Sequence, residues 1–383
     1  MCFICWLCIQ SWYRMDLSIE QQIKAIEDEI FKTQKNKATE HHIGRLKAKI
    51  ARLRETAEKR KSSGAKGKGF SVKKTGDATV GIVGFPSIGK STLLNQLTAA
   101  DSKVGEYDFT TLETVPGMMK YKGAEIQLLD LPGLIVGASK GRGRGREVIS
   151  AVRNVDMLLL MIESYNLHQL DFIEHELRMA GLRLNQRKPD IVISKKTYGG
   201  IIVNSTVPLT HLNELIIKSI ASEFVINADI TLREDLTEDQ LIDSFAQNRT
   251  YISALVVINK TDLAPPDVVR NSINKLRIKQ WDVCAISAKN KENLERLKEQ
   301  IFLHLRLIRI YLKPVGKKPD YTQPMILKEG QTVADACRYI HRDFHRNFRY
   351  ASVWGPSAKH SGQKVGLEHV LRDEDVLTII VTK

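Results

Sequence analysis

One eight-residue segment restricts the fold of this chain more than any other feature. Residues 84–91 read Gly-Phe-Pro-Ser-Ile-Gly-Lys-Ser; they follow a short apolar run, residues 79–83, and precede a helical pattern over residues 91–99. This order is the strand–loop–helix context of a phosphate-binding loop, Gly-x4-Gly-Lys-Ser/Thr. The glycines let backbone N–H groups converge on phosphate oxygens, and the helix N-terminus adds positive potential. We therefore expect an α/β domain that binds a nucleoside triphosphate.

Two side chains of this loop have predicted roles of their own. The Lys90 ammonium is expected to reach the β- and γ-phosphates, and the Ser91 hydroxyl is expected to bind Mg²⁺. The loop by itself does not distinguish ATP from GTP. Its predicted nucleotide contacts are Gly84, Phe85, Pro86, Ser87, Ile88, Gly89, Lys90 and Ser91.

Two later motifs, each at the end of an apolar run, indicate that the base is guanine. Asp262 closes an Asn-Lys-Thr-Asp motif after residues 254–258 and can accept hydrogen bonds from N1–H and the exocyclic amine of guanine. Adenine has no such pair of donors. Asn259 is expected to tether neighbouring loops, with the Lys260 stem over the ring, and a Ser-Ala-Lys backbone N–H is expected to meet guanine O6. The predicted base contacts are Asn259, Lys260, Thr261, Asp262, Ser287, Ala288 and Lys289.

Two further segments are expected to sense the γ-phosphate as parts of an order–disorder switch. Asp130, which begins Asp-Leu-Pro-Gly after residues 126–129, would hold Mg²⁺ through water, and the Gly133 N–H would meet the γ-phosphate. A threonine of Phe-Thr-Thr would complete the magnesium shell, and we favour Thr111 over Thr110. The contacts predicted here are Phe109, Thr110, Thr111, Asp130, Leu131, Pro132 and Gly133. The predicted catalytic set is Lys90, Thr111 and Gly133, and the predicted metal ligands are Ser91 and Thr111.

One group expected of many GTPases is missing. A Gln that orients the attacking water often follows the Asp-x-x-Gly turn, but this chain has Leu134 there. We therefore expect slow hydrolysis until an ion, a partner or another group positions the water. The glycine–arginine run at residues 140–146 has three interpretations. An RNA contact and a solvated loop are favoured equally, ahead of a mobile arginine donor.

The apolar pattern predicts a parallel sheet with crossover helices, because strand-like runs alternate with helical stretches. The strand-like runs are residues 79–83, 126–129, 157–162, 254–258 and 283–286. Residues 182–247 interrupt this alternation. Within them, runs at 191–194 and 200–203 flank a glycine turn like a hairpin, and two helices follow at 212–224 and 236–245. We expect a small α/β subdomain inserted into a nucleotide-binding domain over residues 77–312.

Smaller modules flank this domain. Residues 15–76 should form a basic helical hairpin and linker, with Ser18 as a helix N-cap. After a linker at 313–319, residues up to 383 should form a compact C-terminal module. Its expected elements are strands at 325–327, 350–354, 363–365 and 376–381 and helices at 333–340 and 368–371.

The first 14 residues are expected to be an unstructured extension of the reading frame. Three of the five cysteines lie there, and the five form neither a disulfide framework nor a complete zinc set, which favours a reducing cytoplasm. No run of about 18 apolar residues occurs, so no membrane span is expected.

The net charge of +14 over 383 residues lies mainly at the two ends of the chain. Residues 1–76 hold 17 Lys and Arg against 8 Asp and Glu, and residues 309–383 hold 13 against 8. Such clusters favour a polyanionic partner, either nucleic acid or an anionic membrane surface. A solvated helix face is the alternative reading of the cationic second helix in the N-terminal hairpin.

Taken together, the motifs resemble those of the developmentally regulated GTP-binding protein family of Obg-related GTPases. The segments most similar to the family are residues 84–91, 108–112 with 115–117, and 130–138 with the glycine–arginine run at 141–146. The resemblance extends over residues 15–383. It implies a P-loop GTPase domain with an inserted subdomain, an N-terminal helical hairpin and a C-terminal TGS domain of β-grasp fold.

The resemblance also implies a cytoplasmic GTPase that associates with ribosomes, influences translation and binds a stabilising partner protein. Family hydrolysis is linked to K⁺ as well as Mg²⁺, but Ser87 stands where potassium-using relatives have Asn. The alternative function is a membrane-surface or cytoskeletal GTPase anchored by its basic ends. A nucleotide-binding scaffold without turnover fits Leu134 but not the complete switch set.

Overall fold

The computed structural model describes residues 18–34, 36, 39–63, 75–98, 116–131, 145–246 and 248–382. These residues form two compact units. One contains the N-terminal hairpin and residues 187–251, and the other contains residues 70–186 and 252–383. In the described part of the chain, no helix is both long and apolar enough to cross a membrane.

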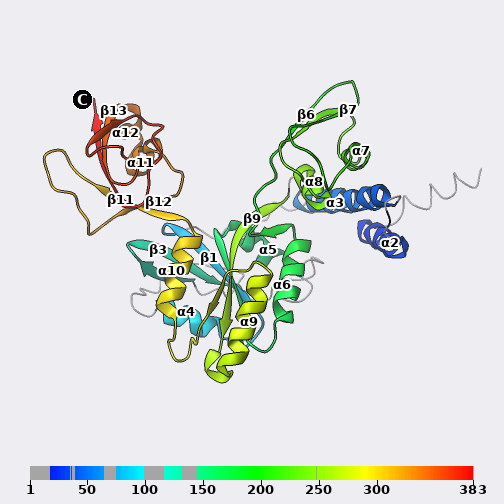
Figure 1. Cartoon of the computed structure of the whole chain (residues 1–383), viewed down its shortest axis with the longest axis horizontal. Coiled ribbons are helices and arrows are strands. Elements are labelled where there is room, and N and C mark those ends of the chain that lie inside the picture. Colours follow the sequence, from blue (N-terminus) through cyan, green and yellow to red (C-terminus); the bar gives the residue numbers. More distant parts are fainter. Residues whose placement is uncertain are drawn as a thin grey trace, which may run out of the picture. The chain divides into compact units, whose positions relative to one another are not determined.

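The second unit is built on a seven-stranded sheet with the order β10-β9-β4-β1-β3-β2, and β5 also pairs with β9 (Figure 1). The strands are β1 (Ala78–Gly84), β2 (Pro116–Tyr121), β3 (Ala124–Asp130), β4 (Met157–Glu163), β5 (Leu182–Leu184), β9 (Thr250–Asn259) and β10 (Val283–Ala285). Four neighbouring pairs are parallel, as the alternating pattern predicts. The edge strand β2 was not predicted; it pairs antiparallel with β3. The central strand β1 is buried at every residue, which explains why it reads as a continuous apolar run.

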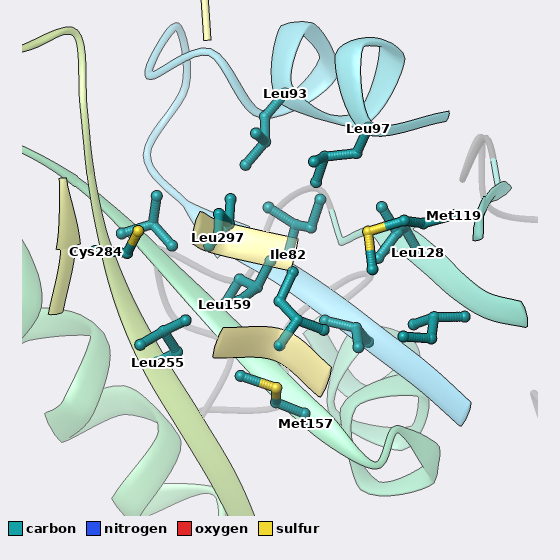
Figure 2. Packing of buried hydrophobic residues seen from close by; sticks show 14 of the residues in the cluster. Ile82, Leu93, Leu97, Met119, Leu128, Met157, Leu159, Leu255, Cys284 and Leu297 are labelled. Carbon is teal, nitrogen blue, oxygen red and sulfur yellow. The ribbon is translucent and has the colours of Figure 1, made fainter. Parts of the chain in front are cut away.

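Helices cover both faces of this sheet. On one face α4 (Lys90–Thr98) and α10 (Leu294–His304) pack over a buried cluster; Figure 2 shows Leu93 and Leu97 of α4 beside Ile82 of β1. On the other face α5 (Gly145–Asn154), α6 (His168–Met179) and α9 (Pro266–Ile278) cover a second cluster. Because helices bury both faces of the sheet, the polar loops lie at the carboxyl ends of the parallel strands.

A five-stranded sheet with the order β12-β11-β15-β13-β14 forms the C-terminal module. Its elements are β11 (Leu307–Leu312), β12 (Met325–Lys328), α11 (Val333–Ile340), α12 (Arg342–Arg346), β13 (Phe348–Trp354), β14 (Gln363–Val365) and β15 (Asp375–Val381). The module is a β-grasp fold, as expected, but its first strand β11 lies before the predicted boundary at residue 313. The predicted helix at 368–371 is wrong. The Leu371 N–H bonds to the Gln331 carbonyl, which holds that segment as a turn.

The first unit pairs the helical hairpin with the inserted subdomain. The hairpin helices are α2 (Ile19–Lys32) and α3 (Glu40–Ser63), and Ser18 caps α2 through a capping box, as predicted. The inserted part has β6 (Ile191–Lys195), β7 (Ile201–Ser205), α7 (Glu214–Ala221), β8 (Ala228–Leu232) and α8 (Glu238–Phe245). Ala48 and Ala51 of α3 pack into the core formed by α7, α8 and the small sheet.

The predicted β6–β7 hairpin is wrong. β8, which was not predicted, lies between the two strands, antiparallel to β6 and parallel to β7. The physical reason is burial: Ala228, Ile230 and Leu232 of β8 are fully buried, whereas β6 and β7 alternate between half-buried and exposed residues. The strand with the most deeply buried side chains therefore lies at the centre of this small sheet.

Candidate nucleotide-binding site

The phosphate loop connects β1 to α4, as predicted, and two of its glycines are required by close contacts. At Gly89 the backbone has φ +96°, and an added Cβ would lie 2.5 Å from Asn259 Nδ2. At Gly84 a Cβ would lie 2.8 Å from the Met161 carbonyl oxygen of β4. These contacts leave room only for glycine, so the loop keeps its backbone close to the neighbouring strands. Ser87, in between, has φ +60°.

Lys90 is held over this loop from the first residue of α4. Its Nζ donates hydrogen bonds to the carbonyl oxygens of Gly84 and Phe85, each at 3.1 Å. The ammonium is therefore positioned above the loop at the N-terminus of a helix, where phosphates are favoured. The contact of Lys90 with the β- and γ-phosphates stays a prediction.

Asn259 joins the base-recognition motifs to the phosphate loop. Its Nδ2 donates to the Ile88 carbonyl at 2.8 Å, and its Oδ1 accepts from the Ala288 N–H at 3.0 Å. Asn259 is only 2% exposed, so these two bonds satisfy a buried amide. The structure thus brings together three motifs that lie up to 200 residues apart in the chain.

Asp262 is exposed, and one of its carboxylate oxygens accepts a hydrogen bond from a neighbouring loop. The Ser287 hydroxyl donates to Asp262 Oδ1 at 2.6 Å, while the Asn290 N–H donates to that hydroxyl at 3.1 Å. The Thr261 N–H bonds to the Ile286 carbonyl at 3.2 Å, which ties the two loops together along the backbone. A carboxylate presented in this way can accept a pair of hydrogen bonds from a base. Lys289 is exposed at the far end of the second loop.

Lys260 makes a contact that the sequence did not reveal. It adopts a left-handed backbone conformation with φ +59°, and its Nζ lies 2.7 Å from Glu163 Oε1. Glu163 ends β4 and is the register partner of Asn259 on β9. The only sequence signal would have been an acidic residue at the carboxyl end of an apolar strand.

Cys284 lies on β10, three residues before Ser287, and is not a nucleophile at neutral pH. It is buried beneath the sheet surface, and this burial raises the pKa of its thiol to about 11. The thiol therefore stays protonated, and Cys284 serves as a small core residue.

The residues present fit a bound divalent cation. The Ser91 hydroxyl lies 3.1 Å from Asp130 Oδ2, and Asp130 Oδ1 is buried with no hydrogen-bond partner among the described residues. A buried carboxylate oxygen without a partner is costly, and a hydrated Mg²⁺ would satisfy it. Leu131, next in the chain, is buried and bonds through its N–H to the Ile82 carbonyl, which fixes Asp130 at the strand end.

The substitution Ser91→Ala tests whether Ser91 and Asp130 hold a divalent cation. We expect GTP hydrolysis in Mg²⁺ to slow by at least about tenfold, because the hydroxyl that would hold the ion is lost. GDP affinity in EDTA should stay within about twofold of the parent value, since no metal contributes there. Hydrolysis assays and nucleotide titrations would measure both, with exposed Thr92→Ala as the control. Equal losses with and without Mg²⁺ would mean that Ser91 supports the loop rather than an ion.

Several predicted site residues lie outside the described part of the chain. These are Phe109, Thr110, Thr111, Pro132 and Gly133, together with Leu134 and most of the glycine–arginine run. Their roles stay predictions.

The fold and this set of loops define a P-loop GTPase. A family model described as a 50S ribosome-binding GTPase matches residues 79–196, and models for the C-terminal region of the MMR_HSR1 domain and for the TGS domain match residues 198–307 and 308–381. Curated relatives match over nearly the whole chain. A GTP-binding protein of Methanocaldococcus jannaschii is 55% identical, with 96% of this chain and 94% of the relative covered.

Two eukaryotic relatives are 48% identical, each with 94% of this chain and 98% of the relative covered. They are ribosome-interacting GTPase 1 of Saccharomyces cerevisiae and developmentally-regulated GTP-binding protein 1 of Xenopus laevis. The chain belongs to the developmentally regulated GTP-binding protein family. It is a GTP-binding protein with the P-loop GTPase fold and a C-terminal TGS domain.

Proposed function

We propose that this GTPase is a cytoplasmic, ribosome-associated switch that influences translation and alternates between GTP and GDP states. The observation that carries the proposal is the joined guanine and phosphate loops, with Asn259 bonded to both the Ile88 carbonyl and the Ala288 N–H. The yeast relative, whose name describes it as ribosome-interacting, supports the choice of partner. A stabilising partner protein and a contribution from K⁺ belong to the same proposal.

Most of the proposed ligands lie in the described loops. Lys90 and the backbone of residues 84–91 hold the phosphates, and Asp262 reads the guanine edge. Ser91 would hold Mg²⁺ and Asp130 would bond to its water, and Thr111, outside the described residues, is the second predicted ligand. When bound, the ion would neutralise charge that develops on the phosphates.

In the proposed reaction, water attacks the γ-phosphorus as its bond to the β,γ-bridging oxygen breaks, which gives GDP and inorganic phosphate and releases a proton to solvent. Lys90 and loop N–H groups stabilise the charge that develops on the oxygens. Leu134 cannot orient that water, because a hydrocarbon side chain neither donates nor accepts hydrogen bonds. Slow intrinsic hydrolysis follows, and a ribosome or partner would supply the missing positioning.

Two cations of α3 form ion pairs with carboxylates of the inserted subdomain. In the N-terminal unit Arg45 pairs with Glu223, and Lys47 pairs with Glu238 and Asp239. These ion pairs connect α3 to the inserted subdomain, whereas Lys49 and Arg52 of the same helix are exposed. The solvated-face and RNA interpretations of the helix therefore both stay predictions.

The C-terminal module carries three exposed arginines close together in the sequence. Exposed Arg342 and Arg346 on α12 and Arg349 on β13 have no carboxylate partner among the described residues. The neighbouring aromatic residues Phe344 and Phe348 pack against the module core instead of offering free rings. We therefore propose that these three arginines contact phosphates of ribosomal RNA.

Charge removal tests the proposal. Arg342→Ala, Arg346→Ala and Arg349→Ala together are expected to weaken co-sedimentation with ribosomes by about tenfold or more and to flatten its dependence on salt, because counterion release falls with each lost phosphate contact. The matched control removes three exposed cations of α9, namely Arg270, Lys275 and Arg277. Binding to anionic vesicles but not to ribosomes would instead support the membrane-surface alternative.

A further inference from the structure

The ion pair between Lys260 and Glu163 is not explained by folding stability. Both side chains are about one-third exposed (35% and 36%), and pairs in that setting contribute little to stability. The 2.7 Å distance therefore indicates a defined orientation of the Lys260 side chain more than an energetic anchor of the fold.

Glu163 is itself held in place by rigid structure. It is the last residue of β4, it lies in register with Asn259, and its backbone N–H bonds to Gln169 Oε1 at 3.2 Å. Lys260 follows Asn259 directly, in a left-handed conformation. Neighbouring parallel strands thus fix both ends of the pair, and the carboxylate is positioned by the sheet and not by a loose loop.

The consequence concerns the four-carbon stem of Lys260. A free lysine side chain has several rotatable bonds and loses entropy when it is ordered by a ligand. With its ammonium held by Glu163, the stem is ordered before the base arrives, and a pre-ordered contact increases affinity.

We propose that Glu163 is a positioning residue for guanine, acting through Lys260 by holding its stem across the place where the base lies. The proposal rests on the proposed role of Lys260 in base recognition. Glu163 itself touches neither the phosphates nor the guanine edge that Asp262 reads.

A double-mutant cycle tests this coupling in the full-length protein. The variants are Glu163→Gln, Lys260→Met and the two combined, and the measurement is the dissociation rate of a fluorescent GDP displaced by excess GDP. Glu163→Gln should speed dissociation by about fivefold, because a lysine stem that is ordered only when the base binds lowers affinity by about that factor. In the Lys260→Met background the same substitution should change nothing. The control is Asp171→Asn, which breaks the 2.7 Å pair between Asp171 of α6 and Lys279 at the C-terminal end of α9.

The outcomes separate the inference from the function on which it rests. If Glu163→Gln has the same effect with and without Lys260, or has none, Glu163 does not act through Lys260 and the inference is overturned. If Lys260→Met leaves the dissociation rate unchanged, Lys260 does not contribute to base binding, and the proposed role of Lys260 on which the inference rests is wrong. Inosine diphosphate provides a second readout: positioning through the stem predicts equal losses for GDP and inosine diphosphate. A loss confined to GDP would mean that the substitution disturbs Asp262, which also overturns the inference.

Discussion

Replacing Lys90 with alanine is expected to abolish tight nucleotide binding. The Lys90 ammonium is held over the phosphate loop by the carbonyls of Gly84 and Phe85, ready to bond phosphate oxygens. Charge-assisted hydrogen bonds to two phosphates are worth about 3 kcal/mol or more, so GTP affinity should fall by at least roughly a hundredfold. Titration with a fluorescent GTP analogue would measure the change.

Two further variants show whether the loss comes from charge at this one position. Lys122→Ala removes an exposed lysine that pairs with Glu299 and should leave affinity unchanged. Lys90→Arg keeps the charge but places a wider planar group above the loop, so it should bind weakly as well. Thermal unfolding of the nucleotide-free proteins checks that the loop variants are folded. Near-parental GTP affinity in Lys90→Ala would contradict the assigned phosphate contact.

The second large effect is expected at Asp262. Asp262→Asn should lower GTP affinity by about a hundredfold and raise the affinity for xanthosine triphosphate, because an amide offers one acceptor and one donor where guanine needs two acceptors. The Ser287 hydroxyl, which already accepts from the Asn290 N–H, donates to Oδ1. The amide oxygen should therefore stay at Oδ1 and the NH₂ should face the base, opposite the 2-oxo group of xanthine.

Displacement of a labelled nucleotide from the site by GTP and by xanthosine triphosphate would measure the affinity for each triphosphate. Asp267→Asn, in the first turn of α9, changes the same charge a few residues along the chain and should have no effect. A variant that loses affinity for both triphosphates alike would show that Asp262 supports the loop without reading the base.

The parts of the site that sequence alone predicted are those encoded by short segments. The phosphate loop, Asn259 and Ser287 each follow an apolar strand directly, so the local sequence places them at a strand end. Because the strands are parallel, these ends meet at one edge of the sheet. The helix cap at Ser18 was predictable for the same reason, since its partner Gln21 lies three residues away.

Other features could not be predicted because they depend on partners distant in sequence. Glu163 meets Lys260 from another strand, 97 residues earlier in the chain. The charge of α3 looked available for RNA, yet Arg45 finds its carboxylate on Glu223, 178 residues away. A net charge counts ions but does not show which of them are paired.

The amino-acid sequence by itself predicted the class of nucleotide, the candidate loops for binding it and the order of the domains, because each is encoded by contiguous residues. Only the tertiary structure decided that β8 lies between β6 and β7, that β11 opens the C-terminal sheet, and which cations face carboxylates. These depend on which surfaces are buried when distant segments pack, and that is set by the competition among all the segments of the fold.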